Sequence, residues 1–274
     1  MKSVIGIVVT ICACVLIVVT FAFGIPYAKY CHAVFLQNNG QIVEAYDAFV
    51  EMGDYRDSLE RAAVLYDQYK IEKFKAAKVG DYIYFGTYEQ DNDFSNGPED
   101  IQWRVLAIED GKALVISKYG LSSRQYHAQD EAVTWENCTL RQWLNGTFLE
   151  EAFSPEEQAR LVMTTVEPDI NSVNQGHHGE PTEDRLFILS YTETLKYMTD
   201  LDARRGIATK RAIAEGSDAN NLRENCWWWT RTAARYPNEV LTVDSSGDIN
   251  RFGDNVADTH YAVRPAMWVQ LGDS

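Results

Sequence analysis

Two adjacent histidines, His177 and His178, are the residues whose types and spacing come closest to metal chemistry. They lie in a loop bounded by glycine and proline, and Glu180 and Asp184 follow within a few residues. Imidazole and carboxylate groups bind a metal ion only where several of them converge on one point. A loop of this kind does not impose that convergence, so we expect neither a metal site nor a bound cofactor.

The acidic loop at residues 91–97 raises the question of calcium binding. An EF-hand loop requires glycine at its sixth position and glutamate at its twelfth. Counted from Asp91, those positions hold Asn96 and Gln102. The spacing therefore predicts a polar hairpin loop and not an EF-hand.

Catalysis has no local signature in this sequence. We find no Ser/His/Asp or Cys/His motif and no glycine-rich phosphate loop after a strand. Of the five cysteines, only Cys138 and Cys226 belong to the globular part. These two either form one disulfide bridge or remain buried thiols. We expect no catalytic residue, and the chain is not expected to be an enzyme.

The most distinctive stretch, residues 226–232, contains three consecutive tryptophans. On a strand, Trp227 and Trp229 share one face, whereas Trp228 lies on the other. Burial of the strand on both sides is the simpler interpretation, because indole rings contribute a large apolar area to a core. The alternative is an exposed aromatic platform on which sugar rings stack.

The N-terminal run of residues 4–23 carries no charge. A helix of that length spans roughly 30 Å, the thickness of the hydrocarbon core of a bilayer. A cleaved signal peptide is the alternative, but its apolar region usually has about 7–15 residues and ends at a small-residue cleavage site. This run is longer and ends in the sequence FGIPY. We therefore predict a retained transmembrane anchor over residues 1–26.

Lysines flank the anchor on both sides, Lys2 before it and Lys29 after it, so charge gives little bias in orientation. A short charged tail translocates least readily, which favours a single-pass protein of the cell membrane with its bulk extracellular. The chain has a net charge of −15, whereas nucleic-acid binding needs a basic surface. The expected partners therefore include the lipid bilayer, through the N-terminal helix, and exclude nucleic acid.

Residues 27–78 are predicted to be helical. Three helices are expected, at 27–37, at 41–52 and from a cap at Asp57 or Ser58 onward. The pattern over residues 40–58 resembles a tetratricopeptide-type helical hairpin. A stable array of such repeats needs about three of them, and only one and a half are present. We expect this short all-α hairpin segment to act as a stalk and not as a peptide-binding groove.

Residues 79–274 change to short strands separated by turns and helices, which predicts one α+β domain. Asp110-Gly111 is a strong hairpin signal, and Pro265 requires an edge or a bulge in the last strand. Helices are expected at 134–146, from Ser154-Pro155 onward and at 191–198. The expected strands are 82–86, 101–108, 113–117, 186–190, 227–232, 240–244, 248–252 and 261–271.

Five blocks of the domain carry a likeness to a known family. They are residues 101–106, 140–145, 187–190, 228–231 and 263–268. In this order they resemble the bacterial domain-of-unknown-function family 6273, over residues 79–271. Members of that family often carry a preceding helical segment and a membrane anchor, as this sequence does.

The block at residues 263–266 also resembles the Gly-Phe-Arg-Pro ending of C-type-lectin-like domains. These include the formylglycine-generating enzymes and the variable proteins of diversity-generating retroelements. The resemblance implies a C-type-lectin-like mixed fold, behind the N-terminal transmembrane helix and the all-α segment. It does not imply the enzyme's activity, because Cys138 and Cys226 stand far apart and do not match its closely spaced cysteine pair.

Together these features predict a membrane-anchored, non-catalytic binding module at the cell surface. Its expected partner is an extracellular glycan, cell-wall fragment or protein ligand. The irregular segment between Arg231 and Tyr261 offers polar groups that core packing does not need. The candidate ligand-binding residues are Arg235, Tyr236, Asn238, Asn250, Arg251 and Asp254. The alternative is a structural or assembly partner of a membrane complex that acts through its helical segment.

Overall fold

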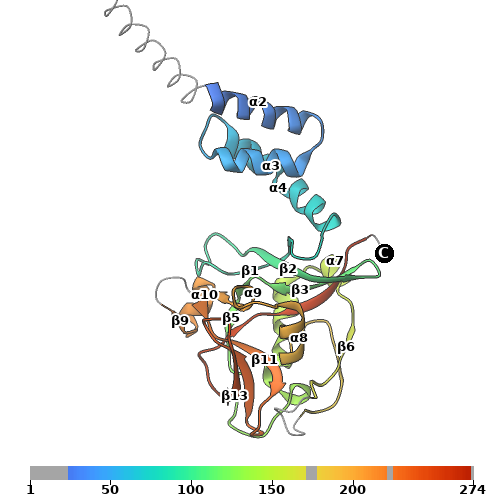
Figure 1. Ribbon diagram of the computed structural model, residues 1–274, viewed down its shortest axis with the longest axis vertical. Helices are drawn as coiled ribbons and strands as arrows, with labels where there is room; N and C mark the ends of the chain where they lie inside the picture. Colours follow the sequence, from blue (N-terminus) through green and yellow to red (C-terminus); the bar gives the residue numbers. More distant parts are fainter. Residues whose placement is uncertain (1–23, 171–177, 221–224, 273–274) are drawn as a thin grey trace, which may run out of the picture. The chain divides into compact units, whose positions relative to one another are not determined.

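The computed structural model describes residues 24–170, 178–220 and 225–272 (Figure 1). The chain divides into two compact units, with the boundary between Ala76 and Ala77. The anchor predicted at residues 4–23 lies outside the described residues. Among the helices of the described ranges, none is long and apolar enough to cross a membrane.

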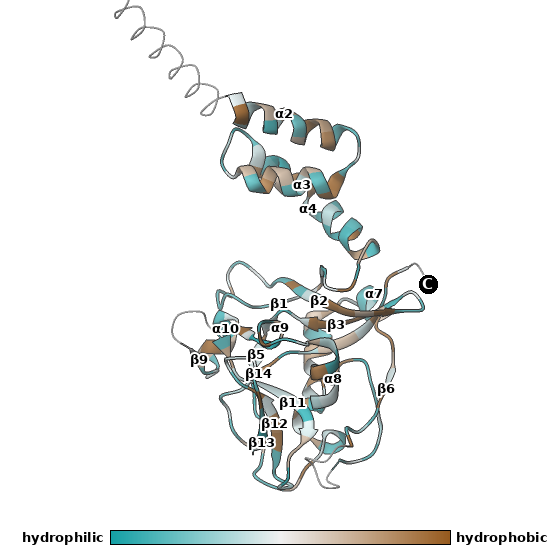
Figure 2. Cartoon of the chain, in the orientation of Figure 1, coloured by the Kyte–Doolittle hydropathy of each residue, from teal (hydrophilic) through white to brown (hydrophobic). Residues whose placement is uncertain are grey.

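The first unit contains α2 (Ile25–Asn38), α3 (Ile42–Met52) and α4 (Ser58–Lys75), close to the predicted ranges. Gly40 adopts a φ of +73° in the turn between the first two helices, a conformation that favours glycine. Hydrophobic and hydrophilic residues alternate along the helices (Figure 2). Some of the hydrophobic residues form the core of this unit, in which Phe49 of α3 is fully buried.

Asp57 stands at the N-cap position of α4, as predicted, but its side chain makes no capping hydrogen bond. Its carboxylate instead accepts hydrogen bonds from the Tyr30 hydroxyl, at 2.5 Å, and from Arg61 Nε, at 2.9 Å. Asp57 therefore occupies the predicted cap position, but its side chain does not cap the helix. Asp57 ties the start of α4 to α2, because a tertiary partner competes with the helix's own amides for the same oxygens.

The second unit is a mixed α+β domain, as predicted. Its first sheet has the order β1-β2-β3-β15, and every neighbouring pair is antiparallel. The strands are β1 (Tyr82–Tyr88), β2 (Glu99–Glu109), β3 (Lys112–Ser117) and β15 (Ala266–Gln270). Asp110 and Gly111 both have positive φ between β2 and β3, which confirms the predicted hairpin turn.

The second sheet has the order β13-β12-β11-β14-β5, in which only the β11–β14 pair is parallel. Its strands are β5 (Ser122–Ser123), β11 (Trp228–Ala233), β12 (Glu239–Val243), β13 (Ile249–Asn255) and β14 (Ala262–Val263). Within the domain, strands β1 to β3 and strands β11 to β13 occupy different ends (Figure 1).

Two smaller sheets complete the strand content of the described residues. One has the order β4-β8-β10-β9 and the other pairs β6 with β7. Their bounds are β4 (Tyr119–Gly120), β6 (Thr164–Val166), β7 (Thr182–Asp184), β8 (Gly206–Ala208), β9 (Ala219–Asn220) and β10 (Asn225–Cys226).

The strand predicted at residues 261–271 is wrong as a single element. It divides into β14, which belongs to the second sheet, and β15, which belongs to the first. Arg264 and Pro265 form the corner between them. Because proline has no amide hydrogen, the ladder cannot continue through this point, and the chain changes sheets there.

The predicted helix at 134–146 is also longer and less regular than expected. It comprises η2 (Trp135–Asn137), α5 (Thr139–Trp143), the π-helical turn η3 (Leu144–Phe148) and α6 (Leu149–Ala152). Asn145 does not end the helix, because its side chain is occupied elsewhere. It donates to Leu186 O, at 2.8 Å, and accepts from the amide of Arg185, at 2.9 Å.

The remaining helices are short. They are α7 (Pro155–Gln158), α8 (Tyr191–Tyr197), α9 (Leu201–Arg204) and α10 (Lys210–Ala214). α7 begins with a capping box between Ser154 and Glu157, as the Ser-Pro sequence predicts. The strand predicted at 186–190 is wrong: the segment is buried but forms only one isolated bridge, Phe187 with Ala266.

Gly86 in β1 provides a test of the packing between β1 and α6. It has a φ of +70°, and a Cβ there would lie 2.6 Å from the Ala152 carbonyl oxygen and 2.6 Å from the Phe153 ring. We expect Gly86→Ala to lower the free energy of unfolding by roughly 3 kcal/mol, from backbone strain and overpacking together. Urea denaturation followed by tryptophan fluorescence measures the loss.

Gly97→Ala is the matched control for that substitution. Gly97 has a φ of +85°, but nothing lies within 4 Å of the added Cβ. Gly97→Ala should therefore lower the free energy of unfolding by only about 1–2 kcal/mol, from backbone strain alone. Equal losses in the two variants would show that Phe153 does not restrict the space at Gly86.

Candidate functional site

Two of the three tryptophans in residues 226–232 are core residues. Trp228 and Trp229 are fully buried, and each indole N–H donates to a backbone carbonyl. Trp228 bonds to Arg204 O at 2.9 Å, and Trp229 bonds to Arg124 O at 2.7 Å. The core interpretation is therefore confirmed for these two, and neither can serve as a sugar platform.

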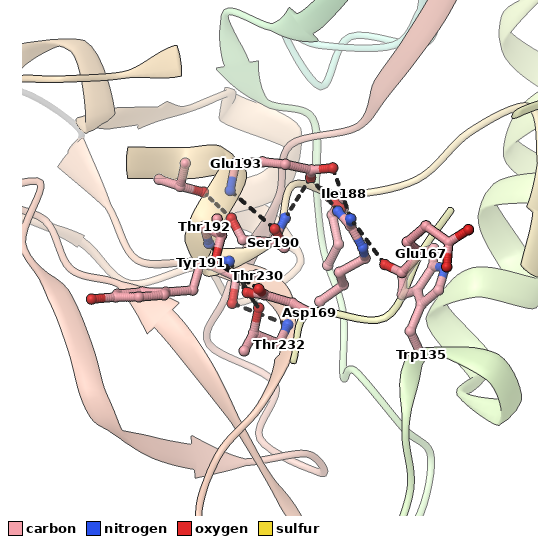
Figure 3. Close-up of polar contacts among 12 residues, drawn as sticks. Trp135, Glu167, Asp169, Ile188, Ser190, Tyr191, Thr192, Glu193, Thr230 and Thr232 are labelled. Atoms are coloured by element: carbon pink, nitrogen blue, oxygen red, sulfur yellow. Dashed lines mark hydrogen bonds and ion pairs between the residues drawn. The ribbon is translucent and has the colours of Figure 1, made fainter. Parts of the chain in front are cut away.

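Arg231, which follows the tryptophans on β11, forms a buried ion pair with Glu193 of α8 (Figure 3). Its Nη1 bonds to one oxygen of the Glu193 carboxylate and its Nη2 to the other, at 2.8 Å. Nη1 also donates to Ile188 O at 3.0 Å. Burial on its own raises the pKa of Glu193, but the charge and hydrogen bonds of Arg231 outweigh it and the pKa is lowered overall.

The same region is held by a second carboxylate, Asp169 (Figure 3). Asp169 accepts hydrogen bonds from the hydroxyls of Thr192 and Thr232, both at 2.6 Å. Thr232 Oγ1 in turn accepts from the amide of Tyr191, at 2.8 Å. These hydrogen bonds join the start of α8 to β11. We call the whole set of residues the Arg231 clamp: Asp169, Tyr191, Thr192, Glu193, Arg231 and Thr232.

A small hollow of about 10 Å³ borders the clamp. Its walls include Trp135, Asp169 and His178, and Arg231 Nε has no hydrogen-bond partner among the described residues. His178 Nδ1 lies 2.9 Å from Gly179 O. Its neighbour His177 lies outside the described residues.

Glu180 lines the hollow, but Asp184, the other carboxylate near the histidines in sequence, does not. Its side chain is fully buried and pairs with Arg141, whose Nε lies 2.7 Å away. It also accepts from Trp135 Nε1 at 3.0 Å and from the Thr182 hydroxyl at 2.6 Å. These donors fill the positions that a metal ion would need, so Asp184 is structural.

Three carboxylates are grouped where β1 leads into the 91–97 loop. The oxygens of Glu89, Asp91 and Glu99 lie within 4.8 Å of one another, which is close enough to share a cation. However, the loop's own amides already use them. Glu99 Oε2 accepts from the amide of Gln90 at 2.7 Å, and Glu89 Oε1 accepts from the amide of Asp93 at 3.1 Å. The cluster therefore accounts for the shape of this polar loop.

A larger cleft, of about 380 Å³, opens between the segment that follows β5 and helix α5. Arg124 and Trp143 face each other on its wall, with the guanidinium carbon 4.2 Å from the centre of the indole ring. Arg124 Nε and Trp143 Nε1 are both buried, and neither has a hydrogen-bond partner in the described part of the chain. Each such orphan donor costs about 1–3 kcal/mol. We call this space the Arg124 cleft.

The six residues predicted to bind a ligand divide into two groups. Asn238, Asn250 and Asp254 make hydrogen bonds within the domain. Asn238 donates to Asp130 at 2.7 Å, and Asp254 accepts from the Thr242 hydroxyl and from Asn250, the latter at 2.9 Å. These three therefore brace the β12–β13 hairpin.

The other three, Arg235, Tyr236 and Arg251, are exposed. The Arg235 guanidinium lies 5.9 Å from the Tyr236 ring, and the Arg251 guanidinium lies 5.5 Å from the Tyr191 ring. The structure thus separates residues that the sequence grouped together.

A bulge in β13 explains the exposure. Val240 pairs with Asp254 and Thr242 pairs with Asn250, so residues 251–253 oppose one residue and leave the ladder. The tip residue Phe252 is 88% exposed, and sequence reasoning missed it. A lone phenylalanine within the polar segment 248–255 was the available signal.

The DUF6273 family of domains of unknown function matches residues 110–271, more than half of the chain. The chain belongs to this family. The match begins at the β2–β3 turn and contains four of the five resembling blocks. No curated protein matches the chain, and no solved structure matches it. The family is thus what the comparisons show.

The DUF6273 domain contains two free, buried cysteines, Cys138 and Cys226. This decides between the two possibilities that the sequence leaves open. Burial raises the pKa of each thiol to about 12, so both stay protonated at neutral pH. Because the thiolate is the reactive form, neither cysteine is suited to act as a nucleophile.

The Arg231 clamp makes a prediction about stability and pH. We expect Glu193→Gln to lower the free energy of unfolding by about 3 kcal/mol at pH 7, because it leaves the buried Arg231 without its anion. The pKa of Glu193 is lower in the folded protein than in the unfolded chain. The extra stability of the wild type is therefore fully present above the unfolded-state pKa of about 4.3, and it is lost as the pH falls through the folded-state pKa.

Chemical denaturation at pH 7 and at pH 3 measures both effects. The difference between wild type and Glu193→Gln should shrink at the lower pH. Glu156→Gln, an exposed glutamate in the first turn of α7, is the control and should change little at either pH. A difference that is the same at pH 3 and pH 7 would mean that the charge of Glu193 is not what stabilises the clamp.

Proposed function

We propose that this protein is a membrane-anchored, non-catalytic binding module whose DUF6273 domain captures a ligand at the cell surface. The observation that carries the proposal is the bulge of β13, which holds Phe252 88% exposed on an ordered hairpin. We call Arg235, Tyr236, Arg251 and Phe252 the hairpin face. It is the part of the predicted ligand-binding segment that is free to meet a partner.

The hairpin face has the composition of a binding surface. An exposed phenylalanine contributes little to folding, since its apolar area stays in water. Aromatic and arginine side chains are the types that carry most of the energy at binding hot spots, and aromatic rings stack on the C–H faces of sugars. The ligand is proposed to be a glycan, a cell-wall fragment or a protein.

The hairpin under this face is rigid, which limits the entropy lost on binding. The amide of Phe252 donates to Asn250 Oδ1 at 3.1 Å, and Asn250 donates to Asp254. Gly253 lies against Ala234 and Glu239, where an added Cβ would overlap the Ala234 side chain. The bulge is therefore seated beside the turn that carries Arg235 and Tyr236.

The rest of the chain fits this proposal as support for the binding domain. The helical unit, with its tetratricopeptide-like pattern, would serve as a stalk, and residues 4–23 would serve as the transmembrane helix with the domain outside. The ending at residues 263–266 supports a C-type-lectin-like scaffold through its resemblance to the ending of such domains. These points extend the proposal by resemblance, and fold alone does not establish a function.

Alanine variants of the hairpin face test the proposal in the full-length protein held in detergent or nanodiscs. Phe252→Ala and Arg251→Ala should each weaken capture of the ligand found on a glycan array or in a cell-wall pull-down, by about tenfold or more. The melting temperature should stay within about 2 °C of wild type, since neither side chain is part of the core.

Two controls make this test specific. Met163→Ala removes another exposed apolar side chain, 51% exposed, and should leave capture unchanged. Asn250→Ala should lower the melting temperature, because Asn250 braces the bulge. Capture that survives both Phe252→Ala and Arg251→Ala would rule out the hairpin face as the binding site.

A second candidate function is an assembly role for the helical unit. Large apolar side chains remain exposed on these helices, including Phe35 at 59% and Val64 at 79%. If they bind a partner in a membrane complex, Phe35→Asp and Val64→Asp should release that partner in co-purification. The same variants should leave ligand capture by the hairpin face intact.

A further inference from the structure

The Arg124 cleft is independent of the hairpin face and shares no residue with it. Its walls come from four places in the chain: residues 123–128 at and after β5, helix α5, Glu215 at the end of α10, and Thr259. Leu140 and Trp143 form its apolar side, whereas Arg124 and Glu215 are its charged groups. A space of about 380 Å³ is within the range of small-molecule sites.

Two unpaired buried donors lie on the wall of this cleft. In the described part of the chain, buried side-chain polar atoms without a partner are Tyr88 Oη, Arg124 Nε, Trp143 Nε1, Ser217 Oγ and Arg231 Nε. Of these, Arg124 Nε and Trp143 Nε1 belong to residues that line the Arg124 cleft. The Arg124 guanidinium stacks on the Trp143 ring.

The charge of the cleft is set by Arg124. Glu215 also lines the space, but its carboxylate is already neutralised. It accepts from Arg211 Nε at 3.0 Å, from the Ser122 hydroxyl at 2.6 Å and from the amide of Ser123 at 3.0 Å. Arg124 has no acidic partner among the residues the structure describes. In a chain with a net charge of −15, an uncompensated half-buried guanidinium favours an anion.

We propose that the Arg124 cleft binds a small organic carboxylate, held by the Arg124 guanidinium and the Trp143 indole N–H. A guanidinium presents parallel N–H groups that match the two oxygens of a carboxylate. The indole N–H beside it supplies a further donor, which has no acceptor among the described residues. The apolar side formed by Leu140 and Trp143 packs against the carbon skeleton of the ligand.

Benzoate is a suitable probe, because it joins a carboxylate to an apolar ring. The full-length protein in detergent is titrated with benzoate, with its neutral analogue benzamide, and with inorganic phosphate. Isothermal titration should show saturable binding of benzoate at one site per chain. Binding of benzamide and of phosphate should be at least tenfold weaker, because the first lacks the charge and the second lacks the apolar surface.

Two variants assign the site. Arg124→Gln should weaken benzoate binding at least tenfold, and Trp143→Phe, which keeps an aromatic ring but removes the N–H, should weaken it severalfold. Arg185→Gln is the matched control and should bind as wild type does. Arg185 is also half-buried and has no acidic partner in the described ranges.

Indole N–H signals of ¹⁵N-tryptophan-labelled protein report the contact directly. The signal that disappears in Trp143→Phe should move on addition of benzoate, and the signal of Trp228 should stay in place. This readout does not depend on the stability of Arg124→Gln. Benzoate binding that is unchanged in Arg124→Gln, or a Trp143 signal that does not move at saturation, would overturn the proposal.

Equal binding of phosphate and benzoate would also overturn it, since the cleft would then recognise charge alone. Failure of this site would leave the hairpin face untouched, because Phe252→Ala and Arg251→Ala alter neither Arg124 nor Trp143. Conversely, loss of glycan or protein capture in those variants, with benzoate binding retained, would show two separate binding sites.

Discussion

The buried guanidinium of Arg264 is the interaction on which the rest of the DUF6273 domain depends. It lies at the corner where the chain leaves the second sheet as β14 and enters the first as β15. Nε and Nη2 donate to Ser117 O, at 3.2 and 3.0 Å, and Nη1 donates to Arg204 O at 3.3 Å. The side chain also stacks on Trp228, 4.9 Å from the ring centre. Burial lowers the pKa of Arg264 to about 10, and these carbonyls compensate the buried charge.

Because that corner joins the sheets, it also positions both surfaces proposed to bind. β14 lies between β5 and β11. Through β5 it orients Arg124 toward Trp143, and through β11 it fixes β12 and β13, which carry the hairpin face. The Arg231 clamp then secures β11 to α8 from the other side. Polar groups in the clamp satisfy one another almost completely, whereas those of the Arg124 cleft do not. That contrast separates a structural network from a candidate ligand site.

Sequence alone determined much of the local structure. The alternation of apolar residues and the turn at Asp110-Gly111 indicated β2 and β3, the Ser154-Pro155 start indicated α7, and helical periodicity indicated α2, α3 and α4. The apolar content of residues 226–232 was also enough to predict that tryptophans form the core. These features depend on contacts between near neighbours in the chain, such as backbone turns, caps and amphipathic periodicity. The ordered blocks at residues 140–268 were sufficient to indicate the family.

Only the tertiary structure decided which polar residues are free. Asn250, Arg251 and Asp254 are all polar residues of the same segment of the sequence. In the structure Asn250 and Asp254 brace the hairpin, whereas the bulge exposes Arg251 and Phe252. Arg124 and Trp143 are separated by the whole of η2 and most of α5, and no local pattern predicts that they stack. Whether a buried donor finds an acceptor depends on chain segments that are distant in sequence. For the same reason, Pro265 indicated only that the last strand is interrupted. The tertiary structure was needed to show that the chain changes sheets at Arg264.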